Sequence, residues 1–318
     1  MARVVVTRPL PEEGILDLVA THEVEILNRM SLDEDELIAA ARDAEGLLTL
    51  LQDPITERVI EGCPRLKVIA QFAVGYENID VQAARREGVI VTHTPGVLTD
   101  ATADLAMALL LAVARRIVEA DRYVRAGRFE RWEATELMGM ELRGRTLGIL
   151  GMGRIGLAMA RRALGFGMDV LYHNRNPANP TEERSVGAQY VSYSELLRRS
   201  DVLSLHCPLN VESRCIVNAG AFSMMKPSAI LINTARGAVV DEEALVEALE
   251  RGTIAGAGLD VYQHEPQVHP RLNQLDNVVL APHLGSATVE TRTQMARMCA
   301  SAILSVLAGK TDIPHRLT

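Results

Sequence analysis

The sequence lacks several features that mark particular protein classes. Its four cysteines are scattered among 318 residues with no C-x-x-C pair, which argues against a disulfide framework and suits a reducing compartment. The longest apolar run, Leu105 to Ala114, is too short to span a bilayer and predicts a buried helix. The opening residues Met1 to Val6 begin directly with an expected strand, without a signal-peptide layout, so we expect a cytoplasmic protein that contacts no membrane.

The sequence also has fewer basic residues than acidic ones. The chain has 33 basic and 41 acidic residues, which gives a net charge of −8. This balance excludes a general attraction to nucleic acid or to anionic membranes. The hydrophobic share of 48% and the charged share of 23% are typical of a globular protein, and the length is enough for two domains with substantial cores.

What the first hundred residues do contain is an alternation of apolar, strand-like segments with helical ones. Before the helix that includes Leu37, the residues Ser31 to Glu34 have the spacing of a capping box. Such alternation predicts a parallel sheet with helices on both faces. The expected strands are residues 4–6, 24–27, 46–51, 66–70 and 89–91.

A second alternating array follows a long helical stretch, Thr99 to about Ala126, and a looser segment around Trp132. Its expected strands are residues 147–150, 168–172, 202–205, 229–233, 257–260 and 278–280, with a final helix over 288–307. We therefore predict an α/β protein with two doubly wound parallel-sheet domains. One domain comprises residues 1–98 and 287–318, and the other, residues 99–286, is inserted in it.

The second array opens on a glycine-rich segment. Gly151, Gly153 and Gly156 have the spacing G-x-G-x-x-G between an apolar strand and an expected helix. In a dinucleotide site the first glycine allows a tight turn, the second admits a pyrophosphate to the backbone, and the third lets helix and strand pack closely. The alternative is a glycine turn in an ordinary α/β core, but the strand–turn–helix context favours a dinucleotide at the helix N-terminus.

The acid that usually completes this fingerprint is missing. In an NAD site an Asp or Glu follows the second strand and binds the ribose 2′-hydroxyl, whereas here the strand is followed by His173, Asn174 and Arg175. Asn174 does not repel a 2′-phosphate, Arg175 can pair with one, and His173 could assist. Although Arg175 could also be a solvated loop residue, the pattern favours NADP(H), with NAD(H) use possible.

Three further residues follow expected strands and carry useful chemistry. Arg236 and His283 come directly after strands, and Glu265 follows one by a short loop. Ligands of open α/β sheets bind outside the carboxyl ends of the strands. A guanidinium can bind a carboxylate, a histidine can donate a proton, and an adjacent carboxylate favours the protonated histidine. Each residue alone has an ordinary structural explanation, but together on a dinucleotide fold they predict the reduction of a small keto acid.

These motifs resemble the D-isomer-specific 2-hydroxyacid dehydrogenases along essentially the whole chain. The resemblance implies a catalytic set of Arg236, Glu265 and His283. It also implies a Rossmann cofactor domain inserted in a flavodoxin-like substrate domain, and it contributes to the expectation of a homodimer. The matching segments are residues 151–156, 233–237, 258–261 with 265–266, and 282–286.

Residues 73–80 and 94–104 look most like the glyoxylate/hydroxypyruvate reductase branch of that family. This resemblance implies NAD(P)H-dependent reduction of glyoxylate or hydroxypyruvate to the D-2-hydroxy acid, with substrate contacts at Leu51, Val74, Gly75, Arg236 and His283. The cofactor contacts that it implies are Thr102, Gly151, Gly153, Arg154, Ile155, Gly156, Asn174, Arg175, Cys207, Pro208, Thr234, Ala235, Asp260, His283 and Gly285.

Two other functions remain open at this point. One is a 2-ketogluconate reductase or a broader 2-keto-acid reductase with the same machinery, which pocket residues around Leu51, Gln52 and Trp132 would decide. The other is a nucleotide-sensing binding protein of the corepressor type, which shares the fold and the catalytic set.

Overall fold

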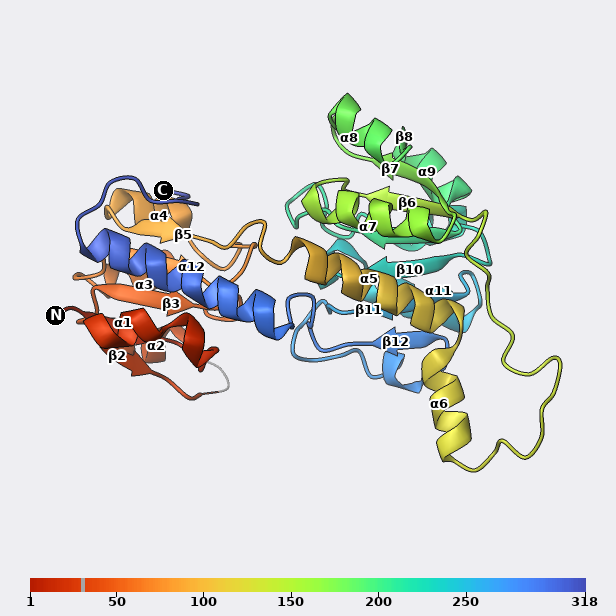
Figure 1. Ribbon diagram of the computed structural model, residues 1–318, viewed down its shortest axis with the longest axis horizontal. Coiled ribbons are helices and arrows are strands. Elements are labelled where there is room, and N and C mark those ends of the chain that lie inside the picture. Colours follow the sequence, from red (N-terminus) through yellow and green to blue (C-terminus); the bar gives the residue numbers. More distant parts are fainter. Residues whose placement is uncertain (30–31) are drawn as a thin grey trace. The chain divides into compact units, whose positions relative to one another are not determined.

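The computed structural model describes residues 1–29 and 32–318 and divides into two compact units (Figure 1). Unit 1 comprises residues 1–98 and 286–318, and unit 2 comprises residues 99–285. Each unit is built on its own sheet, and the pairings within both sheets are parallel. The predicted fold class, two doubly wound parallel-sheet α/β units, is confirmed.

Unit 1 contains a five-stranded sheet in the order β2-β1-β3-β4-β5, which is the flavodoxin-like order. Its strands are β1 (Arg3–Val6), β2 (Glu23–Ile26), β3 (Gly46–Thr49), β4 (Val68–Gln71) and β5 (Ile90–Thr92). Its helices are the 3-10 turn η1 (Glu12–Gly14), α1 (Leu16–Thr21), α2 (Glu34–Ala41), α3 (Glu57–Glu61), α4 (Val81–Arg86) and α12 (Val289–Leu307).

Side chains of β1 alternate between the two faces of this sheet. Val4 and Val6 pack with residues of α1 and α12, whereas Val5 packs with residues of α2, α3 and α4. All three valines are fully buried, as expected for a strand covered on both sides by helices. The chain end returns as α12 to close one face, which is why residues 286–318 belong to unit 1.

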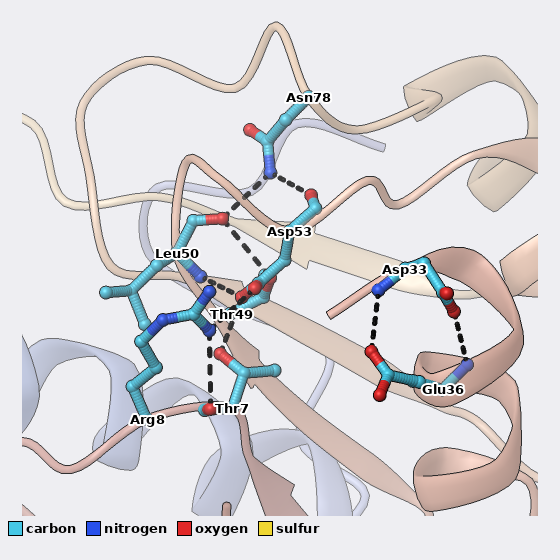
Figure 2. A network of polar contacts seen from close by, with 8 residues as sticks. All are labelled: Thr7, Arg8, Asp33, Glu36, Thr49, Leu50, Asp53 and Asn78. Carbon is cyan, nitrogen blue, oxygen red and sulfur yellow. Dashed lines mark hydrogen bonds and ion pairs between the residues drawn. The ribbon is translucent and has the colours of Figure 1, made fainter. Parts of the chain in front are cut away.

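The start of α2 differs from the expected capping box at Ser31–Glu34. The helix begins at Glu34, and its N-cap is Asp33, whose Oδ1 accepts a hydrogen bond from the backbone N–H of Glu36 at 2.8 Å. Glu36 Oε2 accepts from the backbone N–H of Asp33 at 3.1 Å (Figure 2). The capping box therefore lies two residues later, and Ser31 is outside the described residues. Both positions fit the spacing, and spacing alone does not choose between them.

Unit 2 contains a seven-stranded sheet in the order β12-β11-β10-β9-β6-β7-β8, which is the Rossmann order extended by one strand at an edge. Its strands are β6 (Thr146–Leu150), β7 (Asp169–His173), β8 (Gln189–Tyr190), β9 (Val202–Leu205), β10 (Ile230–Asn233), β11 (Gly256–Leu259) and β12 (Val278–Leu280). Its helices are α5 (Thr99–Ala114), α6 (Ile117–Arg125), α7 (Arg154–Gly165), α8 (Pro180–Ser185), α9 (Tyr193–Arg199), α10 (Ala219–Met224) and α11 (Glu242–Glu250), with 3-10 turns η2 (Gly237–Val239) and η3 (Leu272–Gln274).

Two apolar layers cover the sheet of unit 2. Leu147 and Ile149 pack with residues of α5 and α7 on one face, whereas Leu203 and Leu231 pack with residues of α9, α10 and α11 on the other. In Figure 1, α5 and α7 lie side by side, and residues of the two helices share one cluster of buried side chains. This packing fixes the helix that follows the glycine turn against the sheet.

The prediction of one continuous helix over Thr99–Ala126 is wrong. The chain forms α5 and α6, separated by Arg116 in the left-handed conformation with φ 52°. No glycine or proline marks the break, so the sequence pattern carries no signal for it. The apolar run Leu105–Ala114 lies in α5, most of it buried or half-buried, and none of the described helices combines the length and apolar character needed to cross a membrane.

Candidate active site

The carboxyl edge of the unit 2 sheet gathers the expected cofactor and catalytic residues. Because the strands are parallel, the loops that follow them leave the sheet at the same edge. Gly151 follows β6, Asn174 follows β7, Cys207 follows β9, and Arg236 follows β10. The segments after β11 and β12 complete this edge and carry Asp260, Glu265, His283 and Gly285.

The glycine turn has the geometry that its spacing predicts. Gly151 has φ 96°, and a Cβ there would lie 2.5 Å from the backbone nitrogen of Cys207. A Cβ at Gly156 would lie 2.6 Å from the carbonyl oxygen of Gly151, so helix and turn meet closely. Gly153 is the N-cap of α7, and a Cβ there would meet no described atom within 4 Å. The turn thus leaves open space in front of the first N–H groups of α7, as a pyrophosphate requires.

Asn174 braces this turn. Its Oδ1 accepts a hydrogen bond from the N–H of Met152 at 2.7 Å, and its Nδ2 donates to the Met152 carbonyl at 3.4 Å. Arg175 is largely exposed and forms an ion pair with Glu212 at 3.3 Å. His173 donates through Nδ1 to the carbonyl of Val191 at 2.9 Å. His173 is the last residue of β7, not a residue after it. Of these three residues, Arg175 is the one whose charged group extends into solvent.

A second polar group at this edge suits a bound ligand. The hydroxyl Oγ1 of Thr234 is buried and has no hydrogen-bond partner among the described residues. Buried polar groups are nearly always hydrogen-bonded, so an orphaned hydroxyl at a loop edge points to a ligand or water. The glycine turn, the Arg175 cation and this hydroxyl together fit a nicotinamide dinucleotide.

His283 and Glu265 form a close pair. Nδ1 of His283 lies 2.7 Å from Glu265 Oε2, and the N–H of Tyr262 donates to Glu265 Oε1 at 3.0 Å. Burial by itself would raise the pKa of the Glu265 carboxyl, but His283, Tyr262 N–H and the charge of Arg236 together hold this pKa below its usual value. Glu265 is therefore an ionised acceptor that orients the imidazole ring through Nδ1, and Nε2 is the ring nitrogen that this pair leaves unused.

The loop that carries His283 is held by Asp260. Asp260 Oδ1 accepts from the N–H of Leu284 at 2.6 Å, and Oδ2 accepts from the N–H of Gly285 at 2.8 Å. Thr102 Oγ1 of α5 donates to the Gly285 carbonyl at 3.0 Å. Burial raises the pKa of Asp260, although these backbone N–H groups oppose the rise. Asp260 and Thr102 therefore fix the position of His283, in addition to the cofactor contacts that the resemblance implies.

Arg236 lies in the loop after β10, and its backbone is held by Asn233, the last residue of the strand. Asn233 Nδ2 donates to the Arg236 carbonyl at 3.0 Å, and Asn233 Oδ1 accepts from the N–H of Ala235 at 3.0 Å. The next residue, Gly237, packs directly under the loop after β11, because a Cβ there would lie 1.9 Å from the carbonyl carbon of Tyr262. A glycine at this point brings the arginine loop and the glutamate loop together.

Glu242 is a supporting residue that the sequence pattern did not reveal. Its side chain is buried, and Oε2 accepts from the backbone N–H of Gln263 at 3.0 Å. It therefore fixes the segment between Asp260 and Glu265. Glu242 occupies the first turn of α11, where an acid is expected for the helix dipole alone. The buried contact becomes visible only in the folded chain.

A second histidine at this edge, His206, follows β9. Its Nε2 lies 2.9 Å from Ser204 Oγ, and burial lowers the pKa of the ring to about 4. A ring that is neutral at physiological pH does not supply a proton readily. His206 is therefore a poor candidate for a proton donor at this edge.

The predicted substrate residues of unit 1 lie at the carboxyl edge of its own sheet. Leu51 follows β3, and Val74 and Gly75 follow the neighbouring strand β4. The carbonyl of Val74 accepts from His93 Nδ1 at 2.8 Å, and the carbonyl of Gly75 accepts from Gln71 Nε2 at 3.2 Å. The two loops that the resemblance assigns to the substrate thus start side by side.

The family model for the NAD-binding domain of D-isomer-specific 2-hydroxyacid dehydrogenases matches residues 107–285. The chain belongs to this family. A glyoxylate reductase from Thermococcus litoralis is 48% identical to this family member over 99% of the chain and 96% of the relative. A crystal structure from Thermus thermophilus superposes with a TM-score of 0.94 at 47% identity, covering 99% of this chain and all of the other. An NADPH-dependent glyoxylate/hydroxypyruvate reductase from Sinorhizobium meliloti, in complex with NADP and malonate, has a TM-score of 0.89 at 35% identity and covers 100% of this chain and 97% of its own.

Proposed function

We propose that this dehydrogenase reduces glyoxylate or hydroxypyruvate to the D-2-hydroxy acid. The observation that carries the proposal is the His283–Glu265 pair at 2.7 Å, with the arginine loop packed against the glutamate loop at the same edge of the sheet. The names of the relatives support the substrate class. We also propose that unit 2 is the cofactor domain and unit 1 the substrate domain. Four free cysteines support a cytoplasmic location.

In the proposed reaction a bound nicotinamide supplies the hydride. Arg236 binds the substrate carboxylate through its guanidinium and stabilises negative charge that develops on the carbonyl oxygen. His283 donates the proton from Nε2 to that oxygen, because Nδ1 is engaged by Glu265. Glu265 keeps the ring oriented and favours its protonated form. In the reverse direction His283 accepts the proton from the hydroxyl group.

The test is a direct assay. Purified protein is mixed with NADPH and a panel that includes glyoxylate, hydroxypyruvate and 2-ketogluconate, and the loss of NADPH absorbance is followed. We expect turnover to be fastest with one of the first two acids. Preference for 2-ketogluconate would replace the substrate assignment, and nucleotide binding without turnover of any keto acid would favour a sensing protein instead.

We further propose that NADP(H) is the preferred cofactor. The absence of an acid after β7 and the exposed cation of Arg175 support this preference. Replacing Arg175 by Ala should raise the Kd of NADPH roughly tenfold to a hundredfold, since a charge-assisted contact to a phosphate is worth about 1.5–3 kcal/mol. The Kd of NADH should stay unchanged. Equilibrium titration of both cofactors measures these values.

Glu212, the ion-pair partner of Arg175, provides a second variant that should change NADPH affinity in the opposite direction. Glu212→Gln releases Arg175 from its ion pair and should tighten NADPH binding by up to about fivefold, the range of an exposed pair. Arg199 forms an exposed ion pair with Glu195 on α9 and serves as the control. Arg199→Ala should leave the Kd of both cofactors unchanged. If Arg175→Ala weakens the binding of NADH and NADPH equally, the proposed contact between Arg175 and the 2′-phosphate is wrong.

A homodimer is proposed through α6 and the loop that follows it. Figure 1 shows this segment standing away from the rest of unit 2. It exposes Ile117, Val124, Phe129 and Trp132, an apolar set that a monomer rarely leaves in water. Light scattering should give twice the chain mass, and Val124→Glu with Phe129→Glu should give the monomer. A monomeric wild type would contradict the proposal.

A further inference from the structure

The two loops assigned to the substrate in unit 1 are tied to one another. The first is a turn, residues 50–53 after β3, with Leu51 and Gln52 at its tip. The second is the loop after β4 that contains Val74 and Gly75. Because both loops leave neighbouring parallel strands, the spacing between them shapes the wall that a substrate would meet.

The turn is closed from the inside by Asp53. Its backbone N–H donates to the Leu50 carbonyl at 3.1 Å, and its Oδ2 accepts from the Leu50 N–H at 2.8 Å. The same oxygen accepts from the hydroxyls of Thr7 at 2.5 Å and Thr49 at 2.9 Å, and Oδ1 lies 2.9 Å from Arg8 Nη1. Asp53 is fully buried. The carboxylate therefore anchors the base of the turn to the end of β3 and to the two residues that follow β1 (Figure 2).

Asn78 holds the same turn from the other side. Its Nδ2 donates to the carbonyl of Leu50 at 3.0 Å and to the carbonyl of Asp53 at 2.8 Å, as Figure 2 shows. These two carbonyls flank Leu51 and Gln52. Because one amide nitrogen holds both ends, the tip of the turn projects from a base of fixed shape.

The opposite atom of the Asn78 amide connects to the second loop. Oδ1 of Asn78 accepts from Gln71 Nε2 at 2.8 Å, and the same Nε2 donates to the Gly75 carbonyl at 3.2 Å. Gln71 is fully buried at the end of β4. Carbonyls accept and do not donate, so these partners fix the orientation of both amides. A continuous chain of hydrogen bonds thus runs from the turn through Asn78 and Gln71 to Gly75.

We propose that Asn78 is a positioning residue for the keto-acid substrate, because it holds the Leu51 turn and the Gly75 loop in one fixed spacing. The proposal rests on the proposed function, which assigns both loops to the substrate. Asn78 itself acts only through these loops. An amide is needed because only it donates to two carbonyls at one end and accepts from Gln71 at the other.

Asn78→Asp tests this role with almost no change of shape. The carboxylate keeps the acceptor for Gln71 but loses the donor to the two carbonyls. We expect the KM for glyoxylate and hydroxypyruvate to rise roughly tenfold, because the turn is released. We expect kcat to change less than about twofold and the Kd of NADPH to stay the same, because the residues assigned to proton transfer and cofactor binding lie in unit 2.

The chain offers a matched control. Asn277, just before β12 in unit 2, is also half-buried, and its Nδ2 also donates to two carbonyls, those of Leu249 at 3.5 Å and Ala255 at 3.2 Å. Asn277→Asp should leave the substrate KM unchanged. An equal rise of KM in both variants would overturn the proposal. A fall of kcat in Asn78→Asp in parallel with a fall of its Tm would also overturn it, because both results would indicate a general structural role.

A second measurement is independent of activity. Hydrogen exchange should accelerate in residues 50–53 and 74–76 together in Asn78→Ala, which removes the bonds at both ends of the amide, and in neither segment in Asn277→Ala. Acceleration in only one segment would disprove the connection. If Asn78→Asp does not fold, Asn78→Ala takes its place in the kinetic assay, since it removes the two donated bonds, and also the acceptor for Gln71, without adding a charge. A wild type without keto-acid turnover would refute the proposed function, whereas the exchange result would still decide whether Asn78 connects the loops.

Discussion

Replacing His283 by Ala is expected to lower kcat for keto-acid reduction by roughly a hundredfold to ten-thousandfold, the usual contribution of a general acid. The variant removes the ring that Glu265 holds at 2.7 Å and leaves no group at this position that can donate a proton. The glycine turn and Arg175 are untouched, so the Kd of NADPH should remain within about twofold of the wild type. Steady-state kinetics and cofactor titration measure the two quantities separately.

The control is another histidine–glutamate pair in unit 2. His269 Nε2 lies 3.1 Å from Glu243 Oε2, in a cluster with Arg271 and Glu250. His269→Ala should leave kcat unchanged, because this pair lies outside the catalytic set. Near-normal turnover in His283→Ala would remove His283 from the mechanism, and an equal loss in both variants would indicate damage to the fold.

The parts of this site that the sequence predicted are those whose physical reason is local. The requirement for a positive φ at Gly151 and the open space at Gly153 arise within one strand–turn–helix segment, and a window of a dozen residues contains that information. Arg236 and His283 each lie three residues beyond the end of a strand, so the rule for parallel sheets brings them to one edge. Their roles in the reaction remain proposals.

The parts that the sequence left out depend on partners far away along the chain. Asn78 meets carbonyls 28 and 25 residues before it, and Asn174 meets Met152 22 residues before it. A hydrogen bond between loops requires the register of both strands, and no spacing rule supplies it. The break at Arg116 has a related origin, since a left-handed arginine is stabilised by its surroundings and not by its own propensity.

Replacing Glu265 by Gln should lower kcat/KM for reduction at neutral pH by roughly tenfold to a hundredfold. This factor corresponds to the free energy of a charge-assisted hydrogen bond. The amide keeps the shape of the side chain but loses the negative charge beside His283. The protonated imidazole then loses its stabilising partner, so the pH above which reduction fails should move down. The pH profile of kcat/KM measures this shift.

The sign of the effect on stability follows from the Glu265 carboxyl. Its pKa is lowered in the folded protein, so the ionised group contributes stability at neutral pH, and this contribution is lost as the pH falls through the lowered value. The Tm difference between wild type and Glu265→Gln should therefore be largest near neutrality and shrink in acid. Thermal melts of both proteins from neutral to acidic pH, together with acid unfolding of the wild type, test this pH dependence.

The direction of the reaction provides the strictest test of this pair. Reduction needs the proton on His283, whereas oxidation of the 2-hydroxy acid needs the ring without it. Loss of the carboxylate should therefore lower both the pH above which reduction fails and the pH below which oxidation fails. It should also favour oxidation relative to reduction at neutral pH. Glu243→Gln, which alters the His269 pair in the same way, should move neither limit. If Glu265→Gln lowers both directions equally at every pH, Glu265 orients the ring without setting its charge.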